Sequence, residues 1–316
     1  MEISDNKVNT GLVSIIIPTY NRSELLQEAI QSCMDQIYRP IECIIVDDGS
    51  TDNTKELVNK FIKNSDENFT VKYVYQQNAG AQVARNTGTD AVSGVFIQYL
   101  DSDDLLYPTK IQLQIDYMQK HPNCDAVFGD WHRGILDEKE TVMAYKSNDL
   151  IVQFLTKKCI VNFSMLMRTS LAKKIGDWDI HIKRNQEIDF HLRGVLAGGN
   201  FEYLPGICGL WRTHQEERII TATGIKDVLF FFDKWENILS EKNMLSNDIK
   251  KNIAEILFWF AAQKTADASF LKIKILEKAV SLNSSIHFFN TTKMKILRNM
   301  FGKKNAIRIW ANQAKL

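Results

Sequence analysis

The apolar positions in the first hundred residues alternate between two periods. Short runs rich in β-branched residues recur, and each is followed by apolar residues at helical spacing. Ser23 is placed to cap the first predicted helix, and a later helix is predicted over 81–92. The alternation predicts a parallel sheet with helices on both faces. The predicted strands are residues 13–17, 41–46, 71–75 and 95–100.

The rest of the chain changes character twice. Pro108 is predicted to open another helix, and the segment 126–211 is more irregular. Residues from about 225 onward show an entirely helical pattern, which places a boundary near 216–224. We therefore expect an α/β fold, a mostly parallel open sheet flanked by helices, with an all-helical C-terminal extension. The predicted domains are residues 1–220 and 221–316.

The composition is ordinary for a soluble globular chain of 316 residues, with 45% apolar residues and a net charge of +1. It shows no bias toward nucleic acid. The five cysteines form no CxxC pair, so we expect neither a zinc site nor disulfides, and a reducing compartment. Residues 1–10 lack the apolar core of a signal peptide, and no run approaches the ~20 apolar residues of a spanning helix.

Polar residues gather where the predicted strands end. In open parallel sheets, ligands bind outside the carboxyl ends of the strands. Four such ends would bring an aromatic ring, several carboxylates and an arginine to one rim, which suits a nucleotide. The polar ends are PTYNR (18–22), DDGS (47–50), NAG (78–80) and DSDD (101–104).

The DSDD cluster is the sharpest of these signals. Its three carboxylates repel one another unless a cation lies among them. Hard divalent metals take oxygen ligands from one or two carboxylates together with substrate phosphates. The alternative is a solvated turn, because aspartate is common in turns. The position after a buried strand, beside three other polar strand ends, favours a metal.

Several segments, in collinear order over residues 12–215, resemble family 2 of the inverting glycosyltransferases, which have the GT-A fold. The resemblance implies transfer of a sugar from a nucleotide-sugar donor to an acceptor hydroxyl with a divalent metal, Mn²⁺ or Mg²⁺. The matching segments are VSIIIPTYNR (13–22), IIVDDGSTDNT (44–54), NAGAQVARNTG (78–88), YLDSDD (99–104), GDW (129–131), FSMLMRTSLAKKIGDWD (163–179), QEIDFHLR (186–193) and LWRTH (210–214).

The resemblance also implies roles for individual residues. Tyr20 would lie near the nucleobase, Asp48 would accept a hydrogen bond from it, and Glu187 would be the general base. Asp48 as a helix cap, Arg85 as a surface residue and His214 as a structural histidine remain alternatives. The implied donor-binding residues are Pro18, Tyr20, Arg22, Asp48, Asn78, Arg85, Asp101 and Ser102, and the implied metal ligands are Asp103, Asp101 and His214.

One segment departs from the family pattern. Where the family has Glu-Asp, with the aspartate as base, this chain has Gln186 and Glu187. The glutamate reaches about one methylene further, whereas proton transfer needs a separation of roughly 2.6–3.2 Å. Loss of the neighbouring acid would also tend to lower the pKa of the base. Asp189 is an alternative base, although on a helix it faces elsewhere.

The sequence bears on three possible functions. We expect transfer from a UDP-sugar to a saccharide or lipid-linked saccharide, in polysaccharide, glycolipid, O-antigen or capsule assembly. The altered pair at 186–187 motivates an alternative, a non-catalytic relative that binds nucleotide-sugars as a sensor or scaffold. A dinucleotide-dependent oxidoreductase is nearly excluded, because PTYNR stands where a GxGxxG turn would be needed.

The C-terminal end is basic, since Glu277 is the last acidic residue and eight lysines and arginines follow it. Apolar residues interleave with them, which is typical of an amphipathic helix on an anionic membrane, where each basic residue adds roughly 1 kcal/mol. A solvated end of a helical bundle is an equal alternative. We therefore expect a cytoplasmic protein, with peripheral contact at the inner membrane face as one option.

Overall fold

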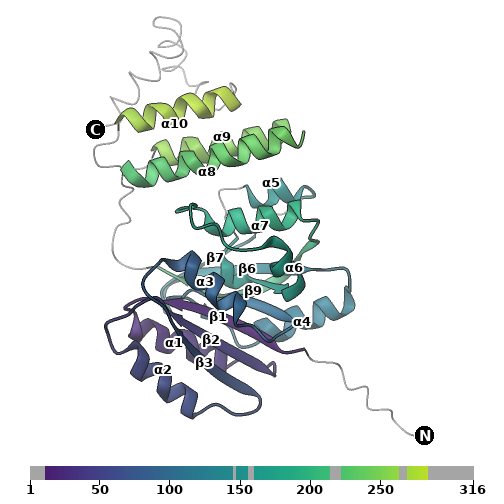
Figure 1. Ribbon diagram of the computed structural model, residues 1–316. Coiled ribbons are helices and arrows are strands. Elements are labelled where there is room, and N and C mark those ends of the chain that lie inside the picture. The colour runs from purple at the N-terminus through teal and green to yellow at the C-terminus, as the bar shows by residue number, and fades with distance from the viewer. Residues whose placement is uncertain (1–10, 145–146, 156–159, 214–221, 263–268, 284–316) are drawn as a thin grey trace, which may run out of the picture. The chain divides into compact units, whose positions relative to one another are not determined.

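A computed structural model describes five stretches of the chain (Figure 1), namely residues 11–144, 147–155, 160–213, 222–262 and 269–283. They form two compact units. The first unit contains 11–144, 160–180 and 190–213, and the second contains 147–155, 181–189, 222–262 and 269–283. The second unit thus takes in two segments from the middle of the chain, and the domain boundary at 220 stays a prediction.

Four parallel strands form the first half of the sheet. They lie in the order β3-β2-β1-β4, with Val13 opposite Ile41 and Ile41 opposite Phe69. Every residue of β1 and β2 is buried, so both sheet faces are covered there. This explains why these strands are continuous β-branched runs instead of alternating patterns. Their bounds are β1 Val13–Thr19, β2 Ile41–Asp47, β3 Phe69–Tyr75 and β4 Phe96–Tyr99.

Helices follow these strands as the sequence predicted. Helices α1 and α2 pack on each other, and α3 packs on β1 and β2. The prediction that Ser23 caps α1 was wrong, because Ser23 is the first helical residue and Arg22 makes no side-chain cap. Instead the Ser23 N–H donates to the Asp52 carboxylate at 3.0 Å, from the loop after β2. The helices are α1 Ser23–Met34, α2 Thr54–Lys63, α3 Ala81–Asp90, α4 Lys110–Lys120 and α6 Thr169–Ile175.

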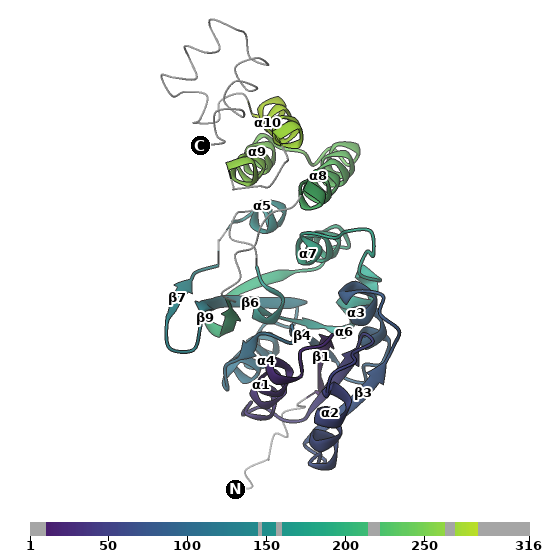
Figure 2. The ribbon, with the colours of Figure 1, turned by 90° about the vertical axis from the view of Figure 1, so that its left-hand side faces the viewer.

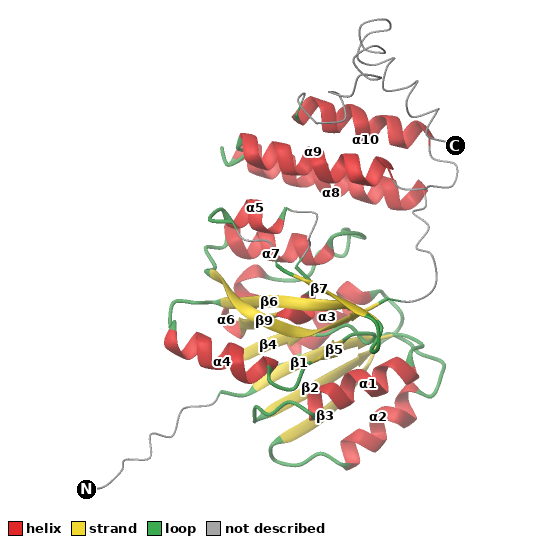
Figure 3. Ribbon diagram, turned by 180° about the vertical axis from the view of Figure 1, so that it is seen from behind, coloured by secondary structure: helices red, strands yellow, loops and turns green. Residues whose placement is uncertain are grey.

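The irregular second segment extends the sheet, whose strands are yellow in Figure 3. From β4 the sheet continues in the order β8-β6-β9-β5. Strand β8 runs antiparallel between β4 and β6, whereas β9 is parallel to β6. The carboxyl ends of β1 to β4, β6 and β9 consequently share one edge. The strands are β5 Leu105–Leu106, β6 Ala126–Gly134, β7 Lys139–Val142, β8 Met165–Arg168 and β9 Phe201–Arg212, with a short 3-10 helix η1 at Asn162–Ser164.

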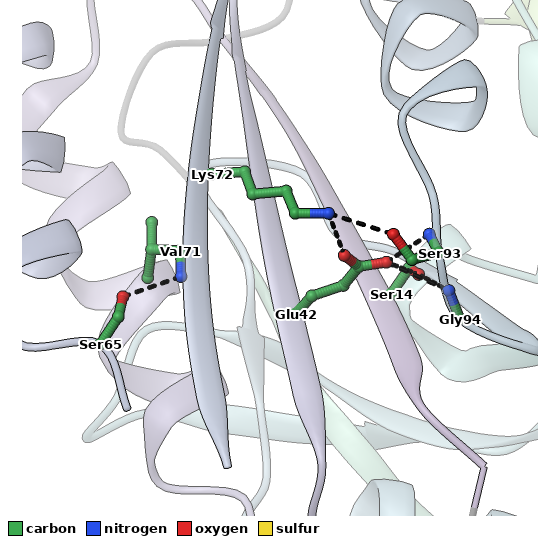
Figure 4. A network of polar contacts seen from close by, with 7 residues as sticks. All are labelled: Ser14, Glu42, Ser65, Val71, Lys72, Ser93 and Gly94. Atoms are coloured by element: carbon green, nitrogen blue, oxygen red, sulfur yellow. Dashed lines mark hydrogen bonds and ion pairs between the residues drawn. The ribbon is translucent and has the colours of Figure 1, made fainter. Parts of the chain in front are cut away.

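A buried carboxylate joins the strands near the opposite edge (Figure 4). Glu42, 2% exposed, accepts from Ser14 Oγ at 2.5 Å and from the backbone N–H groups of Ser93 and Gly94 at 2.6 and 3.1 Å. Its other oxygen accepts from Lys72 Nζ at 2.6 Å. Burial alone would raise the pKa of Glu42, but Lys72 and these hydrogen bonds lower it. The network joins β1, β2 and β3 to the loop before β4.

The described part of the second unit is helical, as the sequence predicted for the C-terminal region. Helix α9 packs on α10 and α5, and α8 packs on α10; Figure 2 views α8 to α10 nearly end-on. Its core includes Phe231, Phe232, Trp235, Ile253 and Leu257. The helices are α5 Leu150–Phe154, the start of α7 (Gln186–Leu196), α8 Ala222–Glu241, α9 Asn247–Ala262 and α10 Ser269–Leu282.

Other sequence predictions concern membrane contact and cysteines. No helix among the described residues has the length and hydropathy needed to cross a membrane. The basic segment 284–316, with its predicted membrane contact, lies outside the described residues. Four cysteines within them are buried and free, whereas Cys159 falls outside.

Candidate functional site

The loops after β1 and β2 are tied together at the carboxyl edge of the sheet. The Asn21 N–H donates to Ser50 Oγ at 2.9 Å, and Asn21 Oδ1 accepts from the Thr51 N–H at 2.8 Å. Asn21 adopts φ +50°, a left-handed conformation that asparagine tolerates. Pro18 is buried in β1, and two residues later Tyr20 is 48% exposed. The loop therefore holds an exposed aromatic ring on a fixed backbone.

Asp48 is buried, with 5% of its surface exposed, and its carboxylate accepts hydrogen bonds from three N–H donors. Its Oδ1 accepts from Gln76 Nε2 at 2.7 Å and from the Ala79 N–H at 2.8 Å, while Oδ2 accepts from the Gly80 N–H at 2.8 Å. Gly80 has φ +98°, which suits glycine, and it directly precedes α3. Asp48 thus fixes the loop before α3, which begins at Ala81, and does not cap α2, whose N-cap residue is Asn53. Asn78, from the same loop, is exposed.

Asp47 shapes the turn after β2. One carboxylate oxygen accepts from the Ser50 N–H at 2.8 Å, and the other accepts from the Tyr73 hydroxyl at 2.6 Å. Burial and this bond to Asp47 raise the pKa of Tyr73. Both carboxylate oxygens of Asp47 therefore have partners within the fold. The turn that they stabilise carries Asp48 at the carboxyl edge of the sheet.

A buried arginine faces the first carboxylate after β4. Arg85 Nη2 lies 2.7 Å from Asp101 Oδ1, and the exposed fractions of the two side chains are 5% and 32%. The Arg85 guanidinium lies over the Trp178 ring, 4.7 Å from its centroid. Trp178 stacks on Phe190 at 4.3 Å and meets Tyr99 edge-on at 5.0 Å. Trp178 is therefore the platform that orients Arg85.

The other two carboxylates of the DSDD cluster have different surroundings. Asp103 Oδ2 lies 2.8 Å from Arg22 Nη1. Asp104 is buried and accepts from the Arg212 N–H at 3.1 Å. Burial, and then repulsion from Asp101 and Asp103, raise the pKa of Asp104 well above its ordinary value. Asp104 is thus directed into the fold, and Asp101 and Asp103, the carboxylates predicted as metal ligands, stay predictions.

Sequence reasoning missed Arg212, which fixes this turn. Its Nε donates to the backbone oxygen of Asp103, and Nη1 donates to Glu28 Oε2 at 2.6 Å. Nη2 donates to the backbone oxygen of Leu25 at 3.3 Å. Arg212 thus ties the end of β9 to the DSDD turn and to α1. The only sequence signal was its place in LWRTH, within the family pattern.

The residues at the end of β4 fit a divalent metal that is completed by a substrate. Among the described residues, no three His, Cys, Asp or Glu side chains gather into a ready-made site. Asp101 and Asp103 supply two carboxylates, with Ser102 buried between them. Mg²⁺ and similar ions commonly take one or two carboxylates and fill other positions with phosphate oxygens. His214, the third predicted ligand, lies outside the described residues.

The predicted base begins α7 in the second unit. Glu187 is half-buried in the first helical turn. Asp189, the alternative base, is buried and accepts from Lys234 Nζ at 2.6 Å and from Trp235 Nε1 at 3.0 Å. These two bonds hold α7 to α8, which gives Asp189 a structural role. Glu187 stays the predicted base.

A shallow pocket borders the platform of Arg85. Its volume is about 350 Å³. The pocket offers carboxylates, an amide and a guanidinium beside an apolar side chain, a mixture that suits a hydroxylated ligand. It is lined by Asn86, Asp177, Trp178, Asp179, Ile180 and Arg193. Trp131 is buried in β6 and does not line this pocket. Trp211 is half-buried, and the Arg133 guanidinium lies 5.1 Å from the centroid of its indole ring.

Comparison with known sequences agrees with this geometry. The family model described as glycosyl transferase family 2 matches residues 14–176, just over half of the chain. An uncharacterised glycosyltransferase of Rickettsia conorii is 32% identical over 188 residues, which cover 56% of this chain and 30% of that protein. The glycosyltransferase GlyG of Streptococcus pneumoniae is 29% identical over 168 residues, covering 53% of this chain and 51% of GlyG. The chain therefore matches only part of these relatives.

Solved structures share the fold. S. aureus TarS 1-349, in complex with UDP-GlcNAc, gives a TM-score of 0.57 at 16% identity, covering 96% of this chain and 87% of that one. The mannosyltransferase PcManGT of Pyrobaculum calidifontis, in complex with GDP-Man and Mn²⁺, gives 0.54 at 14% identity, covering 98% and 85%. This likeness confirms the predicted GT-A fold.

Proposed function

Because the chain belongs to glycosyltransferase family 2, we propose that it is an inverting, metal-dependent glycosyltransferase that uses a UDP-sugar. The observation that carries this proposal is the pair of Arg–Asp contacts at the end of β4, Arg85 with Asp101 and Arg22 with Asp103. Two guanidinium groups and two carboxylates at one sheet edge suit a metal-bound diphosphate. Asp48, at the end of β2 on the same sheet edge, would face the nucleobase.

The chain's own residues would divide the work as follows. Tyr20 and Asp48 would hold the base, and Asn78, Arg85 and Arg22 would lie along the donor. A bound Mn²⁺ or Mg²⁺, held by Asp103 with Asp101 and His214, would stabilise the charge that develops on the diphosphate. Glu187 would take the proton from the acceptor hydroxyl as it attacks the anomeric carbon in line, which inverts the configuration.

The acceptor belongs to a class of hydroxylated molecules. We propose a saccharide or lipid-linked saccharide of polysaccharide or glycolipid assembly, in the cytoplasm. The pocket beside Trp178 supports this, since Asp177, Asp179 and Arg193 could hydrogen-bond sugar hydroxyls and Ile180 could contact a ring face. Residues 284–316 would add contact with an anionic membrane surface.

A second candidate is a non-catalytic nucleotide-sugar sensor, favoured by Gln186-Glu187 in place of the usual acidic pair. The test is release of UDP from a panel of UDP-sugars with Mn²⁺, with water alone and with a panel of saccharide acceptors. We expect one donor to be consumed, faster with its acceptor. A chain that binds UDP yet releases none under every condition would contradict the transferase and support the sensor.

A further inference from the structure

Gln76, which lies outside the predicted site, occupies part of the hydrogen-bonding capacity of the Asp48 carboxylate. A carboxylate only accepts hydrogen bonds, so the amide nitrogen of Gln76 must face Asp48. Its carbonyl oxygen then faces Thr87, whose hydroxyl donates to it at 2.7 Å. The Gln76 backbone N–H donates to the backbone carbonyl oxygen of Asp47 at 2.9 Å, which fixes Gln76 at the end of β3. The orientation of the Gln76 amide is therefore set from both sides.

The acceptor sites of Asp48 can be counted from its partners. Each carboxylate oxygen offers about two lone-pair directions. Oδ1 already accepts from Gln76 Nε2 and the Ala79 N–H, so both of its directions are used. Among the residues that the structure describes, Oδ2 accepts only from the Gly80 N–H. Asp48 can therefore accept one more N–H, through Oδ2.

Nucleobases differ in what they bring to such a carboxylate. Uracil offers a single imide N–H between two carbonyl groups. Guanine offers an N–H and an adjacent amino group, which a free carboxylate pairs with through both of its oxygens. With Oδ1 filled, the guanine amino group would lose its partner, and a buried donor without a partner is costly.

We propose that Gln76 is a specificity-determining residue, which fills Oδ1 of Asp48 and so selects a base with one imide N–H, uracil, over guanine. The inference rests on the proposed function, in which Asp48 faces the nucleobase. Thr87 acts through Gln76 as a positioning residue. Gln76 directly follows β3, and Thr87 lies in α3, the helix that also carries Arg85.

The test is calorimetric titration of the full chain with UDP, GDP and IDP in the presence of Mn²⁺. IDP keeps the purine ring and the single N–H but lacks the amino group, so it separates base size from hydrogen bonding. The wild type should bind UDP at least about tenfold more tightly than GDP, and IDP no more weakly than GDP. Gln76→Leu should free Oδ1 and raise the affinity for GDP relative to IDP about tenfold, and Thr87→Val should do so partly.

Gln77→Leu, at the exposed neighbouring position, is the matched control and should change no ratio. An unchanged GDP to IDP ratio in folded Gln76→Leu would overturn the inference. A wild type that binds GDP more tightly than IDP would overturn it without any variant. Failure of the wild type to bind all three nucleotides is a distinct result, which would overturn the proposed function itself.

Discussion

Arg85 lies between an acid and an aromatic ring, with Nη2 2.7 Å from Asp101 Oδ1 and the guanidinium 4.7 Å from the Trp178 centroid. A guanidinium can stack and donate through a planar fork, whereas an ammonium cannot. We therefore expect Arg85→Lys to lower kcat/KM for the donor roughly 100-fold, as removal of a transition-state donor does. UDP release with Mn²⁺ measures it.

The control for this variant is Arg133→Lys, a half-exposed arginine that also lies over a tryptophan, Trp211. It should leave kcat/KM within about twofold, because surface contacts contribute little. Equal activity of Arg85→Lys and Arg133→Lys would remove Arg85 from the donor site.

Substitution of Glu187 should affect turnover, whereas substitution of Asp189 should affect stability. Glu187→Gln keeps the shape but cannot take a proton, so we expect UDP affinity to be kept and turnover to fall by about 10²–10⁴-fold. Asp189→Asn weakens the bonds to Lys234 and Trp235 and should lower the melting temperature instead. Calorimetry, turnover and thermal unfolding of both variants check this. Near wild-type turnover of Glu187→Gln would assign the base elsewhere.

Lys110 should make stability depend on pH. It is fully buried, its Nζ donates to Gln98 Oε1, and burial lowers its pKa to about 7. Above that pH the unfolded chain binds the extra proton, so stability rises with pH, by at most about 1.4 kcal/mol per unit. Lys110→Met should be more stable than the wild type at pH 7, with the gap narrowing toward pH 9. Urea unfolding measures the free energy of unfolding of both proteins at the two pH values. The same difference between Lys110→Met and the wild type at pH 7 and at pH 9 would contradict this.

The network around Glu42 should affect stability and leave nucleotide binding unchanged. Glu42→Leu leaves Ser14 Oγ and the Ser93 N–H without this acceptor, while the Gly94 N–H keeps its bond to Ser14 Oγ, and should cost roughly 2–3 kcal/mol of unfolding free energy. Lys72→Met should cost under about 1 kcal/mol, because the Lys72 side chain is 44% exposed. The Glu42 contribution is present above its ordinary pKa of 4.5 and is lost as the pH falls below its lowered value. Equal losses in both variants, or a changed UDP affinity, would contradict this.

The sequence predicts local features of this protein better than contacts between distant segments. Strands β1 and β2 were predicted because burial on both faces leaves an unbroken apolar run. Asp104 and Arg212, in contrast, are joined over more than a hundred residues of chain, and no local pattern records that contact. The same holds for Thr87 and Gln76, whose bond joins α3 to the residue that follows β3. The sequence predicted which polar residues lie at the carboxyl ends of the strands. It did not predict which of them bond to other parts of the fold and which stay available to a ligand.

The most direct test of the account is the thermal shift produced by UDP with Mn²⁺, with Mg²⁺ and with EDTA, in the wild type and in Asp103→Asn. The account predicts stabilisation of the wild type by UDP with metal, by roughly 2.7 kcal/mol at 100 times the dissociation constant. EDTA or Asp103→Asn should remove most of it. UDP stabilisation that persists equally with EDTA and in Asp103→Asn would contradict a metal held at Asp103, and no stabilisation by UDP at all would contradict the proposed donor.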